Sequence, residues 1–394
     1  MSKLKKVRLG LVGCGKRGRS VSRLFKIQRD CEITTLMDLY EGPARFTAKE
    51  LDLPDAKIFT DFKKMLREAP VDALFFAGDP TTQADEACEA MRTGRHVCTE
   101  VPAAFSIDQC WNLVKTVEKT GCKYQLMEQA RYWGFIETWK QMHDRGELGH
   151  VALAQGEYVH YLPNYTNWTD VKTGEIFGDL TKPKGRKVEA HWRYSTAVAE
   201  PLYYLPHTLS PLLRILDDRV MRVSCMGTRK QSYTFVDPKL KVPWRDIEYA
   251  LMHTEKDTVL LVGAGFSLPH VPRGPTGCHW YELRGTKGSV TSPRHKSDGF
   301  RVWKDGSSIY QEMDLSLTPP DADEMQARTG HGGADFKPVN TFIRSIIENK
   351  TPPMNVYRSV ETAAPAILGV ESAKRGGVLL EVPDFRRYAK KKKD

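Results

Sequence analysis

Short apolar runs alternate with amphipathic stretches along the N-terminal part of the chain. Runs with the length and character of buried strands cover residues 7–12, 32–37, 73–77, 97–99 and 123–127. The stretches between them predict helices, one over 82–93 and another that begins after Ser106 and ends at Gly121. Strands that alternate with helices through short connections form a parallel sheet that is covered on both faces. We therefore predict an α/β domain with a doubly wound sheet.

The pattern changes near residue 151 to a succession of strands. Strand-like runs cover 152–161, 220–227, 248–253, 258–266, 278–285 and 300–303. Successive strands without long helices between them predict a large open sheet that is mainly antiparallel. Two helical stretches, 338–348 and 359–374, follow, and we expect them to pack back on the first domain. We predict an α/β Rossmann domain over 1–128, an α+β domain over 129–385 and a basic tail over 386–394.

Charge and cysteine content narrow the class of protein. The formal net charge is +10, but much of it comes from lysines near the two ends of the chain, where such runs form solvated tails. The body has no basic stripe interleaved with aromatics, so nucleic-acid binding is not expected. The eight cysteines form no Cys-x-x-Cys pair and no zinc-like cluster, which is typical of a reducing compartment. We find neither a signal segment nor a membrane-spanning run, and we expect a cytoplasmic protein without a metal.

A glycine-rich loop follows the first predicted strand. Residues 13–18 read GCGKRG, a G-x-G-x-x-G between a strand and a helix. Gly13 permits the tight turn, Gly15 lets a pyrophosphate approach the backbone, and Gly18 lets the helix pack on the strand. Asp38 ends the second strand, where its carboxylate would accept hydrogen bonds from the ribose hydroxyls and repel a 2′-phosphate. The predicted cofactor is therefore NAD rather than NADP. Two basic side chains in the loop oppose this preference in part, Lys16 and Arg17.

Later strands of the first domain also end in residues suited to a binding site. Ligands of doubly wound sheets bind outside the carboxyl ends of the strands. We expect cofactor contacts from the residues at these ends, which are Asp79, Pro80, Glu100, Val101 and Glu128.

The segment between Tyr158 and His207 is dense in aromatic residues. It contains Tyr158, Tyr161, Tyr165, Trp168, Trp192, Tyr194, Tyr203 and Tyr204. Loops of this length inside a domain are often functional. Aromatic faces stack on the C–H surfaces of sugars, and phenols and imidazoles transfer protons. We interpret some of these aromatics as core and the others as parts of a site.

Residues 94–102 and two blocks near the C-terminus carry a known pattern. Residues 94–97 read GRHV and 100–102 read EVP, while 331–335 read HGGAD and 382–385 read VPDF. Together they resemble the glucose–fructose oxidoreductase/inositol dehydrogenase superfamily, over about residues 7–385. Two hallmarks of its dehydrogenases are absent, because Val101 replaces the lysine of Glu-Lys-Pro and Tyr203 replaces the aspartate of Asp-x-x-x-His. This double loss argues against an ordinary sugar-alcohol dehydrogenase.

A second set of blocks covers 13–18, 100–104, 110–114, 126–128, 156–160, 192–193 and 204–211. These blocks are similar to one branch of that superfamily, the NAD-dependent α-N-acetylgalactosaminidases and related redox glycosidases. The branch often has Thr-Pro-x-x-x-His after the fourth strand, whereas this chain has Asp79-Pro80 and then Ala84 at the histidine position. Some nicotinamide contacts and the sugar specificity are left open by this departure.

The resemblance implies a redox glycosidase. In such enzymes NAD⁺ oxidises C3 of the sugar, a base removes the acidified C2 proton, and the C1 substituent leaves by elimination. Water then adds at C1 and C3 is reduced again, so no net oxidation occurs. The resemblance assigns Tyr158 to the C2 proton and His207 to the C3 hydroxyl, with His160 aiding the leaving group or the substrate. Glu128 is expected to bind a sugar hydroxyl. Three further residues are expected to bind the sugar, Trp192, Arg193 and Tyr204.

Two other functions are alternatives. A sugar or glycoside 3-dehydrogenase would use almost the same residues and release NADH, and a dinucleotide-dependent sensor would bind NAD without turnover. The positive charge of the body is also compatible with an anionic sugar, such as a sulfonated or uronic one, as an alternative to the acetamido sugar. Members of the superfamily commonly self-associate through the open sheet, so the resemblance also implies a homo-oligomer, a dimer or a tetramer.

Overall fold

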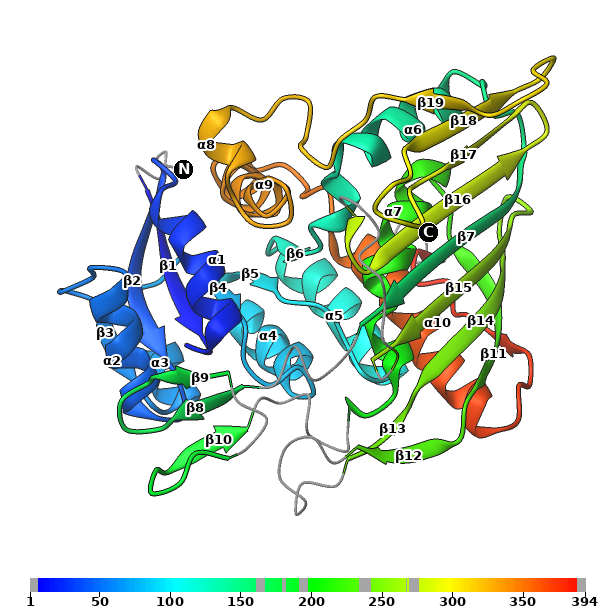
Figure 1. Ribbon diagram of the computed structural model, residues 1–394. Coiled ribbons are helices and arrows are strands. Elements are labelled where there is room, and N and C mark those ends of the chain that lie inside the picture. Colours follow the sequence, from blue (N-terminus) through cyan, green and yellow to red (C-terminus); the bar gives the residue numbers. More distant parts are fainter. Residues whose placement is uncertain are drawn as a thin grey trace.

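The computed structural model describes residues 6–160, 167–178, 182–190, 198–233, 242–266, 268 and 276–387. It contains two domains that lie side by side (Figure 1), a smaller sheet with its helices on the left and a larger sheet on the right.

The first domain is built on six parallel strands in the order β3-β2-β1-β4-β5-β6. The strands are β1 (Val7–Val12), β2 (Cys31–Met37), β3 (Lys57–Phe59), β4 (Ala73–Phe76), β5 (His96–Thr99) and β6 (Tyr124–Leu126). This is the strand order of a Rossmann fold, and it confirms the predicted doubly wound sheet. The sequence pattern did not locate β3, because a three-residue strand is too short to show a period.

Helices cover this sheet on both faces. They are α1 (Lys16–Lys26), α2 (Glu41–Glu50), α3 (Phe62–Glu68), α4 (Gln83–Arg92) and α5 (Ile107–Thr120). The hydroxyl of Ser106 accepts a hydrogen bond from the Gln109 N–H at 3.1 Å, and Gly121 follows α5 with φ 68°. The predicted start and stop signals of α5 are therefore confirmed, since a serine N-cap and a left-handed glycine are the usual ends of a helix.

A helix from the C-terminal part of the chain also covers the first sheet. α9 (Phe336–Ile347) contacts α1, β1 and β6. It buries a stripe at helical spacing in the same apolar cluster as β1, formed by Val339, Phe342, Ile343 and Ile346. The two halves of the chain are thus interleaved in space.

The second domain contains a nine-stranded sheet in the order β19-β18-β17-β16-β7-β15-β14-β11-β20. Its strands are β7 (Val151–Val159), β11 (Val220–Gly227), β14 (Ile247–Thr254), β15 (Val259–Gly265), β16 (His279–Gly285), β17 (Gly288–Thr291), β18 (Phe300–Lys304), β19 (Gln311–Met313) and β20 (Leu380–Glu381). The sheet is mostly antiparallel, as predicted, but β7 and β15 run parallel. The succession of strands does not reveal this pair, because alternation along a strand does not encode its neighbour.

Helices lie on one face of the nine-stranded sheet. They are the 3₁₀ helices η1 (Ala130–Tyr132) and η5 (Pro201–Tyr204), and the α-helices α6 (Gly134–Asp144), α7 (Pro206–Leu216) and α10 (Val356–Lys374). The short helix α8 (Glu324–Ala327) lies near α9 (Figure 1). In the described ranges no helix crosses the opposite face of the sheet, and none has the length and apolar content needed to span a bilayer.

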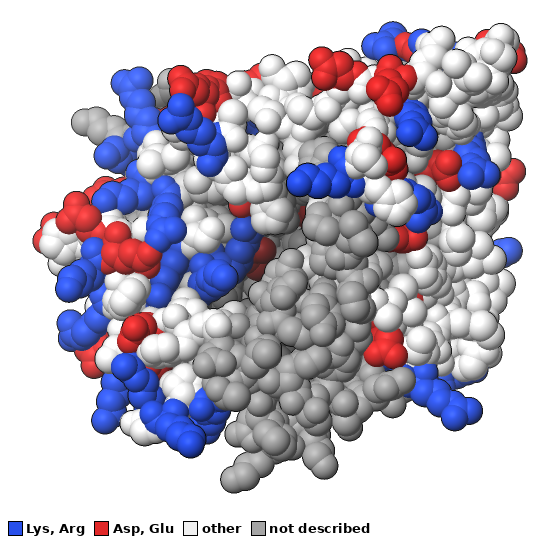
Figure 2. Space-filling view, in the orientation of Figure 1, with Lys and Arg blue, Asp and Glu red and all other residues white. Residues whose placement is uncertain are grey.

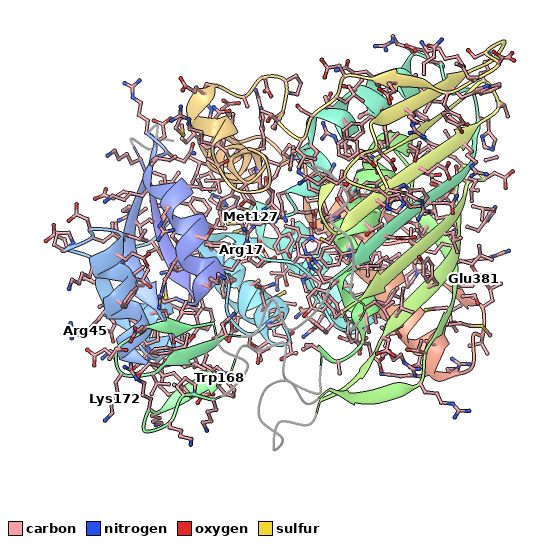
Figure 3. The ribbon with its side chains drawn as sticks, viewed as in Figure 1. Arg17, Arg45, Met127, Trp168, Lys172 and Glu381 are labelled. Atoms are coloured by element: carbon pink, nitrogen blue, oxygen red, sulfur yellow. The ribbon has the colours of Figure 1, made fainter. Side chains whose placement is uncertain are left out.

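Two small sheets complete the described structure. One pairs β12 (Lys230–Tyr233) with β13 (Val242–Arg245), and the other has the order β10-β8-β9, with β8 (Trp168–Asp170), β9 (Ile176–Phe177) and β10 (Val188–Ala190). The three-stranded sheet lies against α2 of the first domain; Figure 3 labels Trp168 in β8 and Lys172 in the turn after it. A segment of the second half of the chain therefore docks on the first domain here too.

We predict that alanine is destabilising at one glycine of the first loop and tolerated at another. A Cβ on Gly18 would lie 2.0 Å from the carbonyl oxygen of Gly13, whereas a Cβ on Gly15 would have no neighbour within 4 Å. Gly18→Ala should lower the free energy of unfolding by about 1–3 kcal/mol, and the control Gly15→Ala should change it by less than about 0.5 kcal/mol. Chemical denaturation of the cofactor-free variants measures both values. Equal stability of the two variants would contradict this packing.

Candidate functional site

A cleft of about 1380 Å³ lies between the two domains. Residues after β1, β4 and β5 form its first-domain wall, among them Lys16, Arg17, Gly78, Pro80, Glu100 and Val101. Its second-domain wall comes from η5, α7 and the residues around β7 and β16, among them Tyr158, His160, Tyr204, His207, Cys278 and His279. In the space-filling view, Lys and Arg side chains gather over the first domain (Figure 2). The first-domain wall of the cleft is thus cationic, and the second-domain wall carries phenol and imidazole rings.

The glycine loop leaves room for a dinucleotide at the start of α1. The open space around Gly15 lets a phosphate approach the backbone, where the unpaired N–H groups of the first helical turn are directed. Gly13 has φ 96°, and a Cβ there would lie 2.5 Å from the Gly78 nitrogen. The predicted roles of these glycines therefore agree with the space around them, and the loop fits NAD.

Asp38 directly follows β2, and its carboxylate is directed at this loop. Oδ2 accepts a hydrogen bond from the Cys14 N–H at 2.8 Å, and Oδ1 accepts one from the Tyr40 N–H at 3.1 Å. A 2′-phosphate beside the loop would meet this negative charge.

Arg17 bridges the two domains. Its Nε lies 2.7 Å from Glu100 Oε1, and its Nη2 lies 3.3 Å from Oδ1 of Asp335 at the start of α9; Figure 3 shows Arg17 directed between the domains. Burial acts to raise the pKa of Asp335, but the charge of Arg17 and a hydrogen bond with His331 outweigh it and hold that pKa below its usual range. The charge of Arg17 is thus balanced by carboxylates, which removes one of the two features that favoured NADP.

Val101 places an apolar side chain in the cleft. It is 7% exposed and packs in the same apolar cluster as Ala103 and Ala104. Gln83 holds the loop on both sides of it, because its Nε2 donates to the carbonyl oxygens of Glu100 at 2.7 Å and Pro102 at 3.2 Å. Position 101 therefore has no group that transfers protons.

Tyr203, the second departure from the dehydrogenase pattern, packs against the same loop. Its ring centroid lies 4.7 Å from that of Phe105. Burial raises the pKa of Tyr203 to about 12, so it stays protonated at neutral pH. Neither replaced position supplies a base, and proton transfer must come from other side chains.

Tyr158 lies at the centre of a cluster of rings in the second-domain wall. Its ring centroid lies 4.4 Å from that of His160, 4.8 Å from that of His207 and 4.8 Å from that of His279. Tyr158 lies in β7 and His160 just after it, whereas His207 lies in α7 and His279 in β16. These elements are far apart in the sequence. The fold thus brings together the three residues predicted to be catalytic, Tyr158, His160 and His207.

His207, in the first turn of α7, contacts Glu128, which follows β6. The Nδ1 of His207 lies 2.7 Å from Glu128 Oε2, while Oε1 of Glu128 accepts a hydrogen bond from the Ala130 N–H at 2.9 Å. A carboxylate beside Nδ1 favours the tautomer with the proton on Nδ1. Nε2 of His207 is then left as an acceptor for the cleft.

The role predicted for Glu128 requires a correction. We expected it to bind a sugar hydroxyl and the cofactor, but its side chain has no exposed surface and is absent from the lining of the cleft. The chain turns into η1 after β6, so the carboxylate lies behind His207. A position at a strand end predicts the neighbourhood of a side chain but not its direction. In this structure the Glu128 carboxylate therefore faces His207 and not the cleft.

His279 is a cleft residue that the sequence analysis missed. It faces Tyr158 across the β16–β7 pair, and its Nδ1 lies 2.9 Å from Tyr281 Oη. Burial raises the pKa of Tyr281 well above its ordinary value, so the phenol stays protonated. Its hydroxyl donates a hydrogen bond to the His207 carbonyl oxygen at 2.9 Å. His279 therefore donates from Nδ1 to Tyr281. The sequence held one indication of this residue, because His279 and Tyr281 alternate along a predicted strand.

His160 and Tyr204 contact other residues of the same wall. The Nε2 of His160 lies 2.9 Å from Cys278 Sγ, and its ring is stacked on that of Phe266 with centroids 5.9 Å apart. Tyr204 packs edge-on against Phe266 at 4.6 Å. Both predicted residues line the cleft.

The remaining predicted residues lie elsewhere. Asp79 does not line the cleft, because its Oδ1 accepts hydrogen bonds from the N–H and hydroxyl of Thr81 at 2.9 and 2.7 Å. Pro80 beside it lines the cleft. Trp192 and Arg193 lie outside the described residues.

Comparison with curated proteins gives relatives that span nearly the whole chain. A glycosyl hydrolase family 109 protein from Saccharopolyspora erythraea is 26% identical over 97% of this chain and 83% of its own length. The alpha-N-acetylgalactosaminidase of Tannerella forsythia is 26% identical over 97% of this chain and 86% of its own length.

Solved structures share the two-domain fold. An oxidoreductase domain protein from Kribbella flavida superimposes with a TM-score of 0.75 at 15% identity, over 96% of this chain and 100% of its own. The scyllo-inositol dehydrogenase of Lactobacillus casei, solved with NAD(H) and scyllo-inositol, has a TM-score of 0.68 at 15% identity, over 96% and 99%. At this identity the likeness concerns the fold alone.

Two family models match consecutive parts of the sequence. The model described as "Oxidoreductase family, NAD-binding Rossmann fold" matches residues 7–128, so the first domain is an NAD-binding domain, as the glycine loop and Asp38 predicted. The model described as "Glycosyl hydrolase 109, C-terminal domain" matches residues 138–392. Because this second match covers more than half of the chain, the protein belongs to glycosyl hydrolase family 109 and is an enzyme of that family.

Proposed function

We propose that the enzyme hydrolyses a glycoside by transient oxidation at C3 of the sugar. Elimination across C1 and C2, addition of water at C1 and re-reduction at C3 complete the reaction, in which no net oxidation occurs. The observation that carries this proposal is the cluster of Tyr158 with His160, His207 and His279 in a cleft shared with the NAD-binding loop.

The carboxylates that line the cleft support the proposal, because arginines already pair with them. An ordinary glycosidase has two carboxylates on either side of the scissile bond. Within the described lining, each glutamate is already paired with an arginine: Glu50 with Arg23, Glu100 with Arg17 and Glu175 with Arg186. The wall around Tyr158 has imidazoles and phenols instead, which suits proton transfers next to a ketone.

The first domain would hold the cofactor through the glycine loop, Asp38 and the loop of Val101. When bound, NAD supplies the reversible oxidation of a sugar hydroxyl to a ketone, and the ketone makes the neighbouring C–H bond acidic. The side chains of the second domain must then take, hold and return two protons.

His207 handles the proton of the C3 hydroxyl in this proposal. With Nδ1 held by Glu128, its Nε2 accepts the proton during oxidation and returns it during re-reduction. The buried carboxylate of Glu128 stabilises the imidazolium that forms in between, as the aspartate of a Ser-His-Asp triad does.

Tyr158 acts as the base for the C2 proton. A phenol has an ordinary pKa of about 10, so its ionised form needs nearby donors. The imidazoles of His160 and His279 lie against its ring and supply them when protonated. Either imidazole can also pass a proton to the leaving oxygen at C1.

An α-linked N-acetylgalactosaminide is the proposed substrate. The relative from Tannerella forsythia is named for this activity. An anionic sugar, sulfonated or uronic, is the second substrate to assay, because Lys16 and several arginines line the cleft.

The proposed function predicts aglycone release without net formation of NADH. Nitrophenyl α-N-acetylgalactosaminide and a panel of neutral and anionic aryl glycosides are incubated with the NAD-loaded enzyme in D₂O. Nitrophenol should form over many turnovers at constant absorbance of NADH, and the released sugar should carry deuterium at C2, because the C2 proton exchanges with solvent.

Other outcomes of this assay point elsewhere. Accumulation of NADH in proportion to consumed sugar, without aglycone, would identify a 3-dehydrogenase. Aglycone release without deuterium at C2 would exclude the elimination step. NAD binding without turnover of any glycoside in the panel would favour a sensor.

We predict that Glu128→Gln disables His207 without disturbing the fold. The amide oxygen would keep the hydrogen bond from the Ala130 N–H, so the amide nitrogen would face His207 and force the proton onto Nε2. This is the wrong tautomer for a base, and kcat should fall by about 10²–10⁴-fold with little change in KM. The kcat measured by steady-state kinetics and the rate of C2 deuteration should fall together.

The matched control for this variant is Glu147→Gln, which removes a surface carboxylate that pairs with Lys304. It should leave kcat unchanged. A Glu128→Gln enzyme with kcat within about threefold of the wild type would show that His207 does not depend on Glu128.

We also propose a cytoplasmic homo-oligomer. All eight cysteines are free thiols, seven of them buried, which suits a reducing compartment. The uncovered face of the nine-stranded sheet carries Leu251 and Val259, which are 54% and 37% exposed, with Leu261 beside Leu251 in the strand register. A second copy of this face would cover them in an isologous contact.

Leu251→Lys should therefore dissociate the assembly. A buried lysine on each side of a two-fold contact adds like charges without partners. Light scattering coupled to gel filtration should give a dimer or tetramer for the wild type and a smaller species for the variant. Met325→Lys, at a position on α8 with 46% exposure, should leave the mass unchanged. A monomeric wild type would refute this proposal.

A further inference from the structure

A second cavity, of about 210 Å³, lies inside the second domain. η1, α6, α7 and α10 contribute its walls, and it shares no lining residue with the large cleft. Its ionisable lining residues are Arg131, Lys140, Arg214, Asp217, Arg358 and Glu361. Cations therefore outnumber carboxylates on its walls.

Arg131 is the unusual residue of this cavity. It is 6% exposed, and its Nη1 donates to Ser210 Oγ at 3.3 Å and contacts Met354 Sδ. Its Cζ lies 5.8 Å from the centroid of the Tyr132 ring, but its buried Nε has no hydrogen-bond partner. A buried charge is costly unless an opposite charge or hydrogen bonds compensate it. Within the described residues the burial of this guanidinium is therefore compensated only in part.

The other charged groups of the cavity are already compensated. Arg214 pairs with Glu137, Lys140 with Asp144, Arg358 with Asp217, and Glu361 with Arg386. Burial lowers the pKa of Arg131 to about 10, and repulsion from Arg214 and Arg358 acts in the same direction, while Tyr132 and Glu128 oppose the shift. That direction is expected for a buried cation whose desolvation is only partly offset by the groups around it.

We propose that this cavity binds a small oxyanion, with Arg131 as its anchor and inorganic phosphate as the probe. A guanidinium presents paired N–H donors that match two oxygens of phosphate. The hydroxyl of Ser210, which contacts Met354 Sδ at 3.8 Å, would have to turn from the sulfur to the anion, and Lys140, which pairs with Asp144, has further ammonium protons on the wall. The volume of 210 Å³ lies below that of pockets for drug-sized ligands, about 300–1,000 Å³, so a nucleotide does not fit.

The site borders the segments that carry the catalytic pair. Arg131 and Glu128 lie in one short segment, and Ser210 and His207 lie one turn apart on α7. A bound oxyanion would hold η1 against α7 behind that pair. The binding itself does not depend on the proposed reaction, so either can fail without the other.

The test measures the thermal stability of the NAD-saturated enzyme as phosphate is titrated at constant ionic strength. Saturation with NAD occupies the pyrophosphate position of the glycine loop, so phosphate cannot report on that loop. The Tm should rise saturably, by about 2 °C or more well above the dissociation constant, and calorimetry should give one site per chain. Chloride at the same ionic strength should give no saturable rise.

Arg131→Met keeps the unbranched stem and removes the charge. It should abolish the phosphate-dependent rise and the calorimetric site, while its Tm without phosphate should stay the same or increase, because an uncompensated buried charge is removed. The control Arg145→Met removes a surface guanidinium that pairs with Glu147, and it should keep the full response to phosphate.

Two milder variants keep the test decisive if Arg131→Met does not fold. Arg131→Lys keeps the charge without the paired donors, and Ser210→Ala removes one donor, so each should weaken phosphate binding about tenfold or more. The proposal is overturned if the wild type shows no saturable response, or if the response survives unchanged in these Arg131 and Ser210 variants.

Discussion

The buried contact between Glu128 and His207 joins the two domains at the proposed centre of chemistry. A carboxylate without exposed surface needs donors or a cation beside it. The Ala130 N–H donates to Oε1 of Glu128, and Nδ1 of His207 lies 2.7 Å from Oε2. This requirement holds the start of α7 against the end of β6. Because α7 also packs on β7 and β16, the same contact sets where Tyr158 and His279 stand relative to the NAD-binding sheet.

Arg17 provides the second link between the domains. It lies between Glu100, after β5, and Asp335, at the start of α9. The glycine loop, the loop of Val101 and the helix that covers the first sheet are thus held through one guanidinium. Since both carboxylates lie near that guanidinium, the charge of Arg17 is balanced, and the carboxylate of Asp38 favours NAD over NADP.

The fold is shared with oxidoreductases, and the chemistry depends on which side chains reach the cleft. Val101 and Tyr203 stand where the related dehydrogenases have proton-transfer groups, and both pack on one loop, one in the apolar core and the other on Phe105. The rings of the cleft come instead from β7, α7 and β16, and the proposed reaction places proton transfer on them. One architecture can thus present different side chains to the same cleft.

The sequence by itself determined the features that depend on neighbouring residues. These are the alternation of strands and helices, the glycine loop with Asp38, and the Ser106 and Gly121 ends of α5, because periods, turns and caps are local. Only the tertiary structure decided that Glu128 lies behind His207, that His279 stands beside Tyr158, and that β7 pairs parallel with β15. Each of these depends on the register of segments far apart in the chain, and a residue pattern within one segment does not encode which distant side chain it will meet.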